Sequence, residues 1–595
     1  MNLFEIVLIV AKVLLLIGFF STMAAVGIWA DRRQSAMVQD RVGPNRAVIH
    51  LPSNIVRVIV LLPPTLLGAM ALRPALSPFI PAFAQVRLPY AFQLLAITTQ
   101  LAILVGWTSL ALLAGVARRS GPINGVEEAF ARVDPRSIFY AGVAVHAVGF
   151  AATSVIPAAS VVTAACVTSA LLAAVFFVAG IYTASRVPDG EVPIRLAGLL
   201  HSVADATKLF LKEDFIPQKA DRLMHALAPM IALFPALVTM AVLPFGKKLC
   251  LLGDPGKPAD WSDLGRVAPE MGRTFMCRGH AVGMQIADLD VGILYVFAMA
   301  GTGVVGAALA GWASDNKFSL LGGLRAASQM VSYEVAMGLS LVGLFLVYGS
   351  VRLSSMAEWQ GENTWGIFVQ PFAFFLFLAA LVAETKRVPF DQPEGESEIV
   401  AGYFVEYSGF KFGMFFMGEY IELVFSSALL VTLFFGGCEL PFLHNDGVTV
   451  AFGDTHLFEY RMNHLAVVLI SVVAFFGKTI LMAWLQVFFR WTLPRFRYDQ
   501  VMKLGWTKLL PLSLANLMVT GVLVLAADTA GPAVKDALRI AADVTQAIVA
   551  VGALAAFVAL VVGLLEPVER KKFLQSTAAR LASAAGGTKT EPQQA

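Results

Sequence analysis

The chain has 595 residues, of which 57% are hydrophobic and only 14% are charged, and its mean hydropathy is +0.73. Since a soluble domain carries roughly 25% charged residues, a soluble globular protein is excluded, and the small net charge of +3 gives no sign of a nucleic-acid partner. The four cysteines lack the spacing that holds an iron–sulfur cluster, and the chain carries neither a dinucleotide-binding nor a phosphate-binding glycine motif. If the protein takes part in a redox reaction, the redox centres are therefore expected on other chains.

Apolar runs of about 20 residues, the length of a membrane-spanning helix, recur along the whole chain. They predict an all-α polytopic membrane protein with about thirteen transmembrane helices. The expected spans are residues 3–30, 55–72, 91–117, 138–157, 160–185, 225–246, 288–311, 329–349, 366–384, 412–437, 464–489, 509–527 and 541–565. The first run is too long for the core of a signal peptide and no cleavage pattern follows it, so we expect a span.

Basic residues in the short loops predict the orientation, because Lys and Arg concentrate in cytoplasmic loops. The loops after residues 30, 117, 185 and 489 are rich in them, and the loops on the opposite side are poorer. The exception is the long loop 247–287, whose six basic residues are mostly offset by its acids. We therefore expect the N-terminus outside and the C-terminus in the cytoplasm. A tail over residues 571–595, rich in Ala, Gly, Thr and Gln, is expected to be disordered.

The long loop 247–287 is expected on the outside and carries Cys250 and Cys277. In an oxidising periplasm the two thiols can form a disulfide. The alternative is two unpaired thiols, and the sequence does not decide between them.

The most informative stretch is residues 383–413, AETKRVPFDQPEGESEIVAGYFVEYSGFKFG, which directly follows an apolar run. Acidic groups beside hydrocarbon are unfavourable unless they face a protein interior, water or a partner. Asp391 and Glu394 could begin a helix through a capping box, which explains only two of the six acids. Close carboxylates raise one another's pKa, which suits groups that take up and release protons. The six acids are Glu384, Asp391, Glu394, Glu396, Glu398 and Glu406.

Further acids lie within the expected spans. Glu334 is early in one span, and Glu419 and Glu422 are three residues apart in the span after the acidic loop. Such groups can relay protons through intervening water. The alternative is a structural buried ion pair, for example between these acids and Lys478 of a later span.

Basic segments flank this region. A turn of Gly43, Pro44 and Asn45 lies between Arg41 and Arg46. A second basic segment, RWTLPRFRYD at residues 490–499, could bind lipid headgroups, a docked soluble subunit or the acidic loop. Residues 199–212 form an amphipathic pattern that predicts a helix in the membrane interface.

Taken together, these segments resemble the NuoH-type membrane subunit of respiratory complex I, the family of mitochondrial NADH dehydrogenase subunit 1. The resemblance covers residues 1–50 and about 195–570, with the matching segments in the family's order. The matching runs are GPNRA at 43–47, VADATKLFLKED at 203–214, GWASDNKFSLLGGLRAASQMVSYEVAMGL at 311–339, AETKRVPFDQPEGESEIVAGYFVEYSGFKFG at 383–413 and RWTLPRFRYDQVMKLGWTKLLPLSLAN at 490–516.

The resemblance implies the membrane subunit of a proton-translocating NADH:quinone oxidoreductase, which forms the membrane side of the quinone chamber and couples quinone reduction to proton translocation. It implies chamber roles for Arg32, Arg46, Asp205, Lys208, Glu384, Arg387, Asp391 and Glu406. It implies proton-coupling roles for Glu334, Glu394, Glu396, Glu398 and Glu419. It implies docking or loop-stabilising roles for Arg490, Arg495 and Arg497.

The family also implies the molecules with which this chain works. Quinone would be the substrate, and no cofactor or metal would be bound by this chain alone, because NADH, FMN and the iron–sulfur clusters belong to partner subunits. Those partners would be the soluble quinone-site and iron–sulfur subunits, small membrane subunits and antiporter-like subunits. The location would be the bacterial inner membrane.

One departure from the family is an extra segment at residues 51–195, which would add about four spans to a family core of about nine. Because four is even, the inserted spans would leave the orientation of the rest unchanged. The expected organisation is residues 1–50 with the first span and basic turn, the insert at 51–195, and the core at 196–570 with an enlarged outside loop.

Two other interpretations compete with this one. One is the related membrane subunit of an energy-converting hydrogenase or formate hydrogenlyase, which needs no quinone; retention of the basic turn and the whole acidic loop favours complex I. The other is a standalone transporter, a class whose folds usually contain internal repeats, and the sequence shows none.

Overall fold

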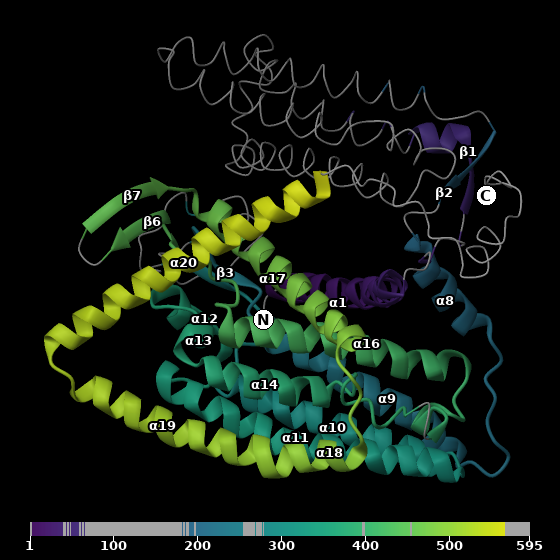
Figure 1. Ribbon diagram of the computed structural model, residues 1–595. Helices are drawn as coiled ribbons and strands as arrows, with labels where there is room; N and C mark the ends of the chain where they lie inside the picture. Colours follow the sequence, from purple (N-terminus) through teal and green to yellow (C-terminus); the bar gives the residue numbers. More distant parts are fainter. Residues whose placement is uncertain are drawn as a thin grey trace, which may run out of the picture.

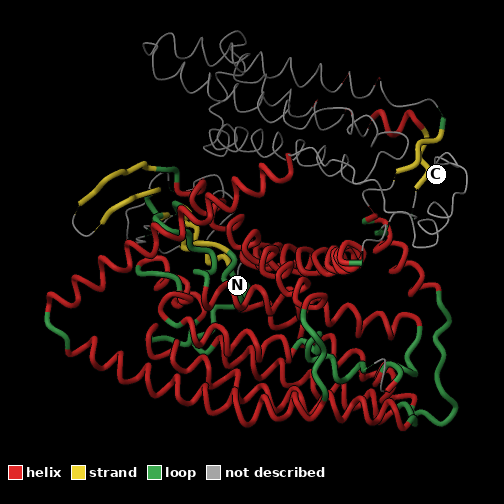
Figure 2. The backbone as a smooth tube through the Cα atoms, in the orientation of Figure 1, coloured by secondary structure: helices red, strands yellow, loops and turns green. Residues whose placement is uncertain are grey.

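The computed structural model describes residues 3–39, 49–58, 190–194, 198–253, 279–395, 399–452 and 455–565, together with residues 43, 44, 47, 61, 65, 181, 185, 268 and 277 between them (Figure 1). These residues are mostly helical, as the apolar runs predict. Most of the long helices lie roughly side by side, and the loops gather mainly at their two ends (Figure 2).

Seven helical segments of the described residues are long and apolar enough to cross a membrane, and each overlaps an expected span. They are α1 (Leu3–Val38), α9 with the 3-10 turn η2 (Arg222–Val238 and Thr239–Val242), α10 (Gly292–Ala313), α11 (Lys317–Tyr348), α16 (Gly409–Phe434), α17 (His464–Thr492) and the run of α18, the π-helical turn η5 and α19 (Tyr498–Leu504, Gly505–Leu509 and Leu510–Thr529).

Two further expected spans have other forms. The apolar run 366–384 folds as the single turn α13 (Gly366–Val369) and the short helix α14 (Pro371–Glu384), because Pro371 has no N–H to continue a helix and instead begins one. The run 541–565 lies inside the longer helix α20 (Pro532–Leu565). The four expected spans between residues 55 and 185 lie almost entirely outside the described residues.

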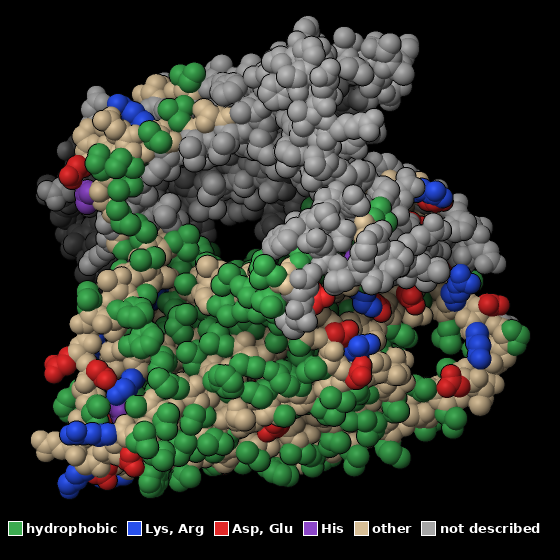
Figure 3. Space-filling model, turned by 180° about the vertical axis from the view of Figure 1, so that it is seen from behind, with side chains coloured by type: hydrophobic (Ala, Val, Ile, Leu, Met, Phe, Trp, Pro, Cys, Tyr) green, Lys and Arg blue, Asp and Glu red, His purple; other side chains and the backbone are tan. Residues whose placement is uncertain are grey.

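The amphipathic segment after residue 199 folds as α8 (Leu200–Leu211), and α12 (Leu353–Glu362) and the 3-10 turn η4 (Gly402–Phe404) connect longer helices. On the rear face of the molecule, hydrophobic side chains cover the helices and charged side chains gather toward the edges (Figure 3). This distribution suits a bundle whose middle is surrounded by lipid.

Three small antiparallel sheets make the fold mostly helical rather than all-α. They pair β1 (Ile49–Pro52) with β2 (Glu191–Ile194), β3 (Gly246–Leu251) with β4 (His280–Met284), and β5 (Leu443–His444) with β6 (Gly447–Phe452) and β7 (Thr455–Arg461). Strands β1 and β2 escaped prediction because each is short and pairs with a segment far away in the chain. Strands β5, β6 and β7 pair with their immediate neighbours, and they escaped prediction because they are short strands in a connection between two spans.

A disulfide joins Cys250 of β3 to Cys277. The alternative of two unpaired thiols is therefore wrong. The backbone N–H of Cys250 also donates to Nε2 of His464 at 3.2 Å, which ties this loop to the start of α17.

Helix α16 lies at the centre of the bundle, because 78% of the residues in its most apolar stretch of 18 residues are buried. The main core surrounds it with side chains from α1, α11, α14 and α17, including the fully buried Phe20, Tyr333, Phe377 and Phe475. Glycines allow the backbones to approach closely at the helix contacts, as is usual in membrane bundles.

Gly322 of α11 is one such contact. A Cβ at this position would lie 2.6 Å from Cα of Gly402 and 2.7 Å from the backbone N of Tyr403. Because both atoms belong to the backbone, no side-chain rotation can relieve that overlap, so α11 and η4 can meet here only with glycine.

We predict that Gly322→Ala lowers the free energy of unfolding by about 1–3 kcal/mol, the usual penalty of overpacking. The measurement is thermal unfolding of the detergent-solubilised protein. Gly303→Ala on α10 is the matched control, since nothing lies within 4 Å of its Cβ position. Equal unfolding temperatures for the two variants would contradict the close contact.

Candidate functional site

The acidic loop between α14 and α16 folds into the protein rather than out into water. Glu384, Thr385, Lys386, Arg387 and Gln392 are each at most 8% exposed. The backbone has positive φ values at Lys386, Val400 and three glycines of this region, which lets a charged segment turn back tightly on itself. Three charged residues of the sequence motif, Glu384, Lys386 and Arg387, therefore lie in the protein interior.

Gln329 of α11 holds the first part of this loop. Its buried amide Nε2 donates to the carbonyl of Ala383 at 2.7 Å and to that of Phe390 at 2.8 Å. Gln392 in turn donates to the carbonyl of Phe496. These bonds satisfy buried carbonyls that would otherwise destabilise an irregular backbone.

Asp31, near the end of α1, is bound by three separate groups. Its carboxylate accepts from the Tyr420 hydroxyl at 2.8 Å, from Arg490 at 2.6 Å and from the Trp491 indole N–H at 2.6 Å. Arg387 lies 3.9 Å from the same carboxylate, with its guanidinium 3.9 Å from the centre of the Tyr420 ring. We call these five residues the Asp31 node, which joins α1, α16, α17 and the loop.

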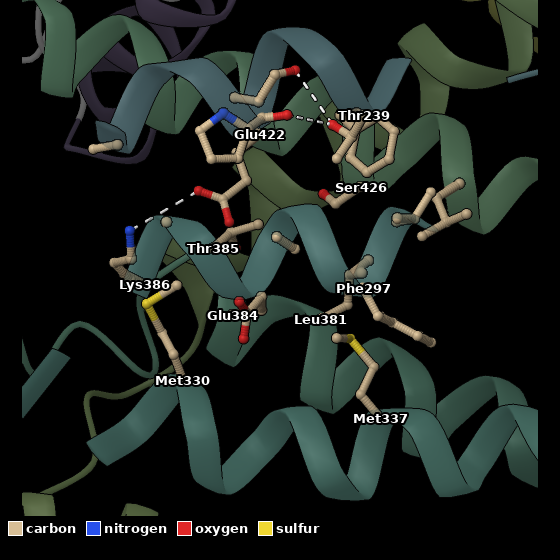
Figure 4. A pocket seen from close by; sticks show the side chains of 18 residues that line it. Thr239, Phe297, Met330, Met337, Leu381, Glu384, Thr385, Lys386, Glu422 and Ser426 are labelled. Atoms are coloured by element: carbon tan, nitrogen blue, oxygen red, sulfur yellow. Dashed lines mark hydrogen bonds and ion pairs between the residues drawn. The ribbon is translucent and has the colours of Figure 1, made fainter. Parts of the chain in front are cut away.

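A second set of charges lies beside the Asp31 node. Lys386 is 4.0 Å from Glu422 of α16, and Glu384 faces the same cavity from the end of α14 (Figure 4). Burial alone would lower the pKa of Lys386, but the carboxylates around it, Glu422 and Glu419 foremost, raise it above the ordinary value. Lys386 is therefore a permanent cation among acids.

The cavity beside Glu384, Lys386 and Glu422 has a volume of about 50 Å³, which is room for a small number of water molecules. It is lined mainly by apolar groups and extends along α16 as far as Ser426 and Leu429. Water held there would have polar partners at the loop end and fewer along the helix.

Glu394 and Glu419 form a pair of carboxyl groups within hydrogen-bonding reach of each other. The Tyr403 hydroxyl donates to Glu419 at 3.3 Å. Burial raises the pKa of Glu394, and the neighbouring Glu419 raises it further against the opposing effect of Arg490. Two such carboxyls titrate as a unit and can hold one proton between them.

Glu334 lies close to this cluster from α11. Its carboxylate is 3.3 Å from the Cβ position of Gly301, and it is near enough to Glu384 to interact with it electrostatically. The structure thus brings Glu334, Glu384, Glu394 and Glu419 into one region with Glu422, as a relay requires.

The residues expected at the quinone chamber fall into smaller groups. Arg32 and Asp205 form an ion pair of 2.7 Å between α1 and α8. Lys208 is exposed on α8. Glu406 accepts from Asn316 at 2.6 Å. Arg46, Glu396 and Glu398 lie outside the described residues.

Among the open alternatives for the basic segment, the acidic loop is the partner of Arg495. Its guanidinium donates to the carbonyl of Asp391 and lies 3.4 Å from the carboxylate of the same residue. Arg497 begins α18, where its backbone N–H donates to Gln500 at 3.0 Å.

The suggested ion pair of Glu419 or Glu422 with Lys478 is wrong. Lys478 donates to the carbonyls of Phe435 and Glu439, both at 2.8 Å and beyond the far end of α16. Lys386 and Arg387 are the cations near the two acids instead. They lie two and three residues after Glu384 in the sequence, but no local pattern shows that the loop turns them back onto α16.

Other residues of the site also escaped prediction. Asp31 resembles part of a basic anchor, because two arginines follow it. Tyr420, Trp491 and Gln329 carry no sequence signal, since an aromatic or an amide inside an apolar run is usually a packing residue. Only the fold shows that these residues converge.

These features define a polytopic helical membrane protein with a buried cluster of acids and bases at one end of its bundle. The family model described as NADH dehydrogenase matches residues 190–521, and the chain belongs to this family.

Named relatives agree over the same region, and they are subunits of NADH-quinone oxidoreductase. The relative from Cytophaga hutchinsonii, a subunit of type H, is 37% identical over 328 residues, covering 55% of this chain and 84% of the relative. The relative of the same type from Geobacter metallireducens is 41% identical over 337 residues, with 56% and 86% covered. The relative from Rhodothermus marinus, named as subunit 8, is 38% identical over 327 residues, with 54% and 83% covered.

We predict that Asp31→Ala lowers the free energy of unfolding by about 3–5 kcal/mol, because it leaves buried cations without their counter-charge. Asp205→Ala is the control, since the Arg32–Asp205 pair is 45% and 35% exposed and such pairs contribute about 0–1 kcal/mol. Thermal unfolding of both variants measures the difference. A loss for Asp31→Ala no larger than for the control would refute the role of the Asp31 node.

The raised pKa of Glu394 predicts a pH dependence of stability. The folded protein holds this proton more tightly than the unfolded chain, so stability falls as the pH rises from the unfolded carboxyl pKa of about 4.3 toward the raised value. Glu394→Gln removes that loss. The unfolding temperature of the variant should therefore increase relative to that of the wild type as the pH rises through this window.

The control for this prediction is Glu362→Gln, on an exposed acid of α12. Its unfolding temperature should stay parallel to the wild type at every pH. A Glu394→Gln curve that is also parallel to the wild type would show that Glu394 does not carry the shift.

Proposed function

We propose that this chain is the membrane subunit of a proton-translocating NADH:quinone oxidoreductase, in which it forms the membrane side of the quinone chamber and links quinone reduction to proton movement. The observation that carries the proposal is the buried cluster of Glu384, Lys386 and Glu419, within the residues that the family model matches. The names of the relatives support the same reaction and do not favour a hydrogenase.

The chamber residues are proposed to be Arg32, Arg46, Asp205, Lys208, Glu384, Arg387, Asp391 and Glu406. The exposed apolar side chains of α8, Phe210 and Leu211, suit a surface over which an apolar quinone passes from the bilayer. NADH, FMN and iron–sulfur clusters belong to the partner subunits, and quinone is the substrate to which they deliver electrons.

Reduction of a quinone to a quinol consumes two electrons and two protons, so it creates a demand for protons at the chamber. We assign the transmission of that demand to Glu334, Glu394, Glu396, Glu398 and Glu419. Lys386 and Arg387 keep positive charge beside these acids, so a proton lost at one carboxyl changes the proton affinity of the next. Arg490, Arg495 and Arg497 are assigned to holding the loop and docking the soluble arm.

The finer topology is also a proposal. The chain has about thirteen spans, with its N-terminus outside and its C-terminus in the cytoplasm. It is organised as an inserted unit at residues 51–195, the core at 196–570 and a disordered tail at 571–595. The pairing of β1 with β2 supports the insert, because it brings residues 49–52 against 191–194 and so closes the segment at its ends.

The proposed partners are the soluble quinone-site and iron–sulfur subunits, small membrane subunits and antiporter-like subunits, in a bacterial inner membrane. A mild-detergent pull-down from native membranes, with mass spectrometry and a quinone-reductase assay, tests this assembly. Co-purification of NADH-oxidising subunits with quinone reduction is expected. Recovery with a nickel–iron hydrogenase would reject the proposal.

Glu384→Gln, Glu396→Gln and Glu398→Gln should each leave the complex assembled and lower NADH:quinone turnover. For Glu384→Gln we expect a loss of at least about tenfold, equivalent to about 1.4 kcal/mol of activation free energy, because the amide cannot take up or release the proton. Asp528→Asn, at an exposed acid of α19, is the control and should keep full turnover. Normal turnover in all three variants would contradict the coupling role.

A further inference from the structure

A second group of buried charges lies at the other end of α16 from the acidic loop. It surrounds a cavity of about 520 Å³ that Lys247, Lys248, Glu358, Glu362 and Glu439 help to line. Helix α16 has 26 residues, so its two ends are separated by about 39 Å. This cavity is therefore distinct from the site at the loop.

An ion pair lies in the wall of this cavity. Nζ of Lys247 is 2.6 Å from Glu439, and the two side chains are only 8% and 7% exposed. Lys247 also donates to the carbonyl of Leu443 at 3.0 Å. The absence of a Cβ at Gly361 makes room for the carboxylate, since that atom would lie 2.8 Å from Oε2 of Glu439.

The presence of this buried ion pair is not explained by a contribution to the stability of the fold. The solvation free energy that two charges lose on burial often exceeds the free energy of their mutual attraction. Replacement of a buried ion pair by apolar residues of similar volume therefore often leaves a protein equally stable or more stable. A second cation, Lys478, is bound to the Glu439 carbonyl close by. Burial raises the pKa of Glu439, although Lys247 opposes this effect.

Buried polar groups lead from the acidic loop toward this pair. Glu422 and Ser426 line the first cavity, which ends at Leu429. Gln486 of α17 donates to Ser427 at 3.0 Å and to Ser426 at 3.3 Å. These groups occupy successive turns of α16 in an otherwise apolar bundle.

The row continues past the first cavity. Thr432, one turn after Leu429, is fully buried, and its carbonyl accepts from Gln360 at 2.8 Å. Gln360 also accepts from the N–H of Gly436 at 2.9 Å, three residues before Glu439. Between Ser427 and Thr432 the described residues of this row offer no proton-exchanging side chain, and the Gln360 amide beyond Thr432 cannot exchange a proton either. Water molecules are therefore needed for transfer at both places.

We propose that the cavity around Lys247 and Glu439 is an aqueous vestibule, in which Glu439 receives protons along the polar row of α16 and releases them to the side opposite the acidic loop. This inference rests on the proposed function and assigns a release site to it. In each transfer, the Glu439 carboxylate gains one proton and then gives one proton to vestibule water, while Lys247 remains charged and holds the carboxylate in place.

The test uses the assembled complex in liposomes with its soluble arm outside and a pH-sensitive dye in the lumen. The measured quantity is the number of protons delivered per NADH oxidised. Glu439→Gln should lower this ratio while quinone reduction continues, because the amide keeps its shape but cannot exchange a proton. The paired variant Lys248→Met with Glu358→Gln, which removes the more exposed ion pair of the same cavity, should keep the wild-type ratio.

A second variant separates proton transfer from structure. Lys247→Met with Glu439→Leu removes both charges and leaves no unpaired cation, so it should fold and still show the low ratio. A wild-type ratio in this double variant, or in Glu439→Gln, would overturn the inference. A wild-type complex that does not reduce quinone with NADH would reject the proposed function, and this inference with it.

Solvent access gives a readout independent of turnover. His444, which lines the vestibule, is replaced by cysteine in a background that carries both Cys166→Ser and Cys438→Ser, so that the disulfide-bonded Cys250 and Cys277 are the remaining cysteines of the chain. A membrane-impermeant maleimide should label it only from the side opposite the acidic loop. Labelling only from the loop side, or none until detergent is added, would also overturn the inference.

Discussion

The buried carboxylate of Asp31 is the point on which the arrangement of the site depends. This carboxylate accepts hydrogen bonds from a tyrosine of α16 and from an arginine and a tryptophan of α17. It also attracts the guanidinium of Arg387 in the loop. Hydrogen bonds to a charged acceptor are the stronger kind, and these four groups come from three parts of the chain. Asp31 thereby fixes where the acidic loop meets the helices.

Around that point, the protein keeps charge inside an apolar bundle by supplying each group with neighbours of opposite sign. Lys386 lies between Glu422 and Glu419, and Lys247 lies against Glu439 at the other end of α16. Isolated charges of this kind would be neutralised or expelled. The mixture of acids with fewer cations leaves some carboxyls with raised proton affinity, and this property is what a proton-handling protein needs.

Sequence alone predicted the parts of this structure that depend on local composition. Long apolar runs predicted the seven candidate spans, and six acids after residue 383 marked the loop. Partners such as Asp31 with Trp491, 460 residues apart, cannot be read from the chain, because neither residue has a local pattern that requires the other. The same holds for Lys386 with Glu422, and it explains why Lys478 was an incorrect choice of partner. Strands β1 and β2, which pair across the inserted segment, escaped prediction for the same reason.

The two hydrogen bonds of Gln329 have a mechanical consequence. They tie α11 to carbonyls on both sides of Glu384 and Arg387, and each buried bond contributes about 0.5–1.5 kcal/mol. Separation of the segment from Ala383 to Phe390 from α11 therefore breaks both bonds and costs about 1–3 kcal/mol. A change of shape that draws Arg387 away from Asp31 without this cost carries α11 along, and with it Glu334, five residues further on the same helix.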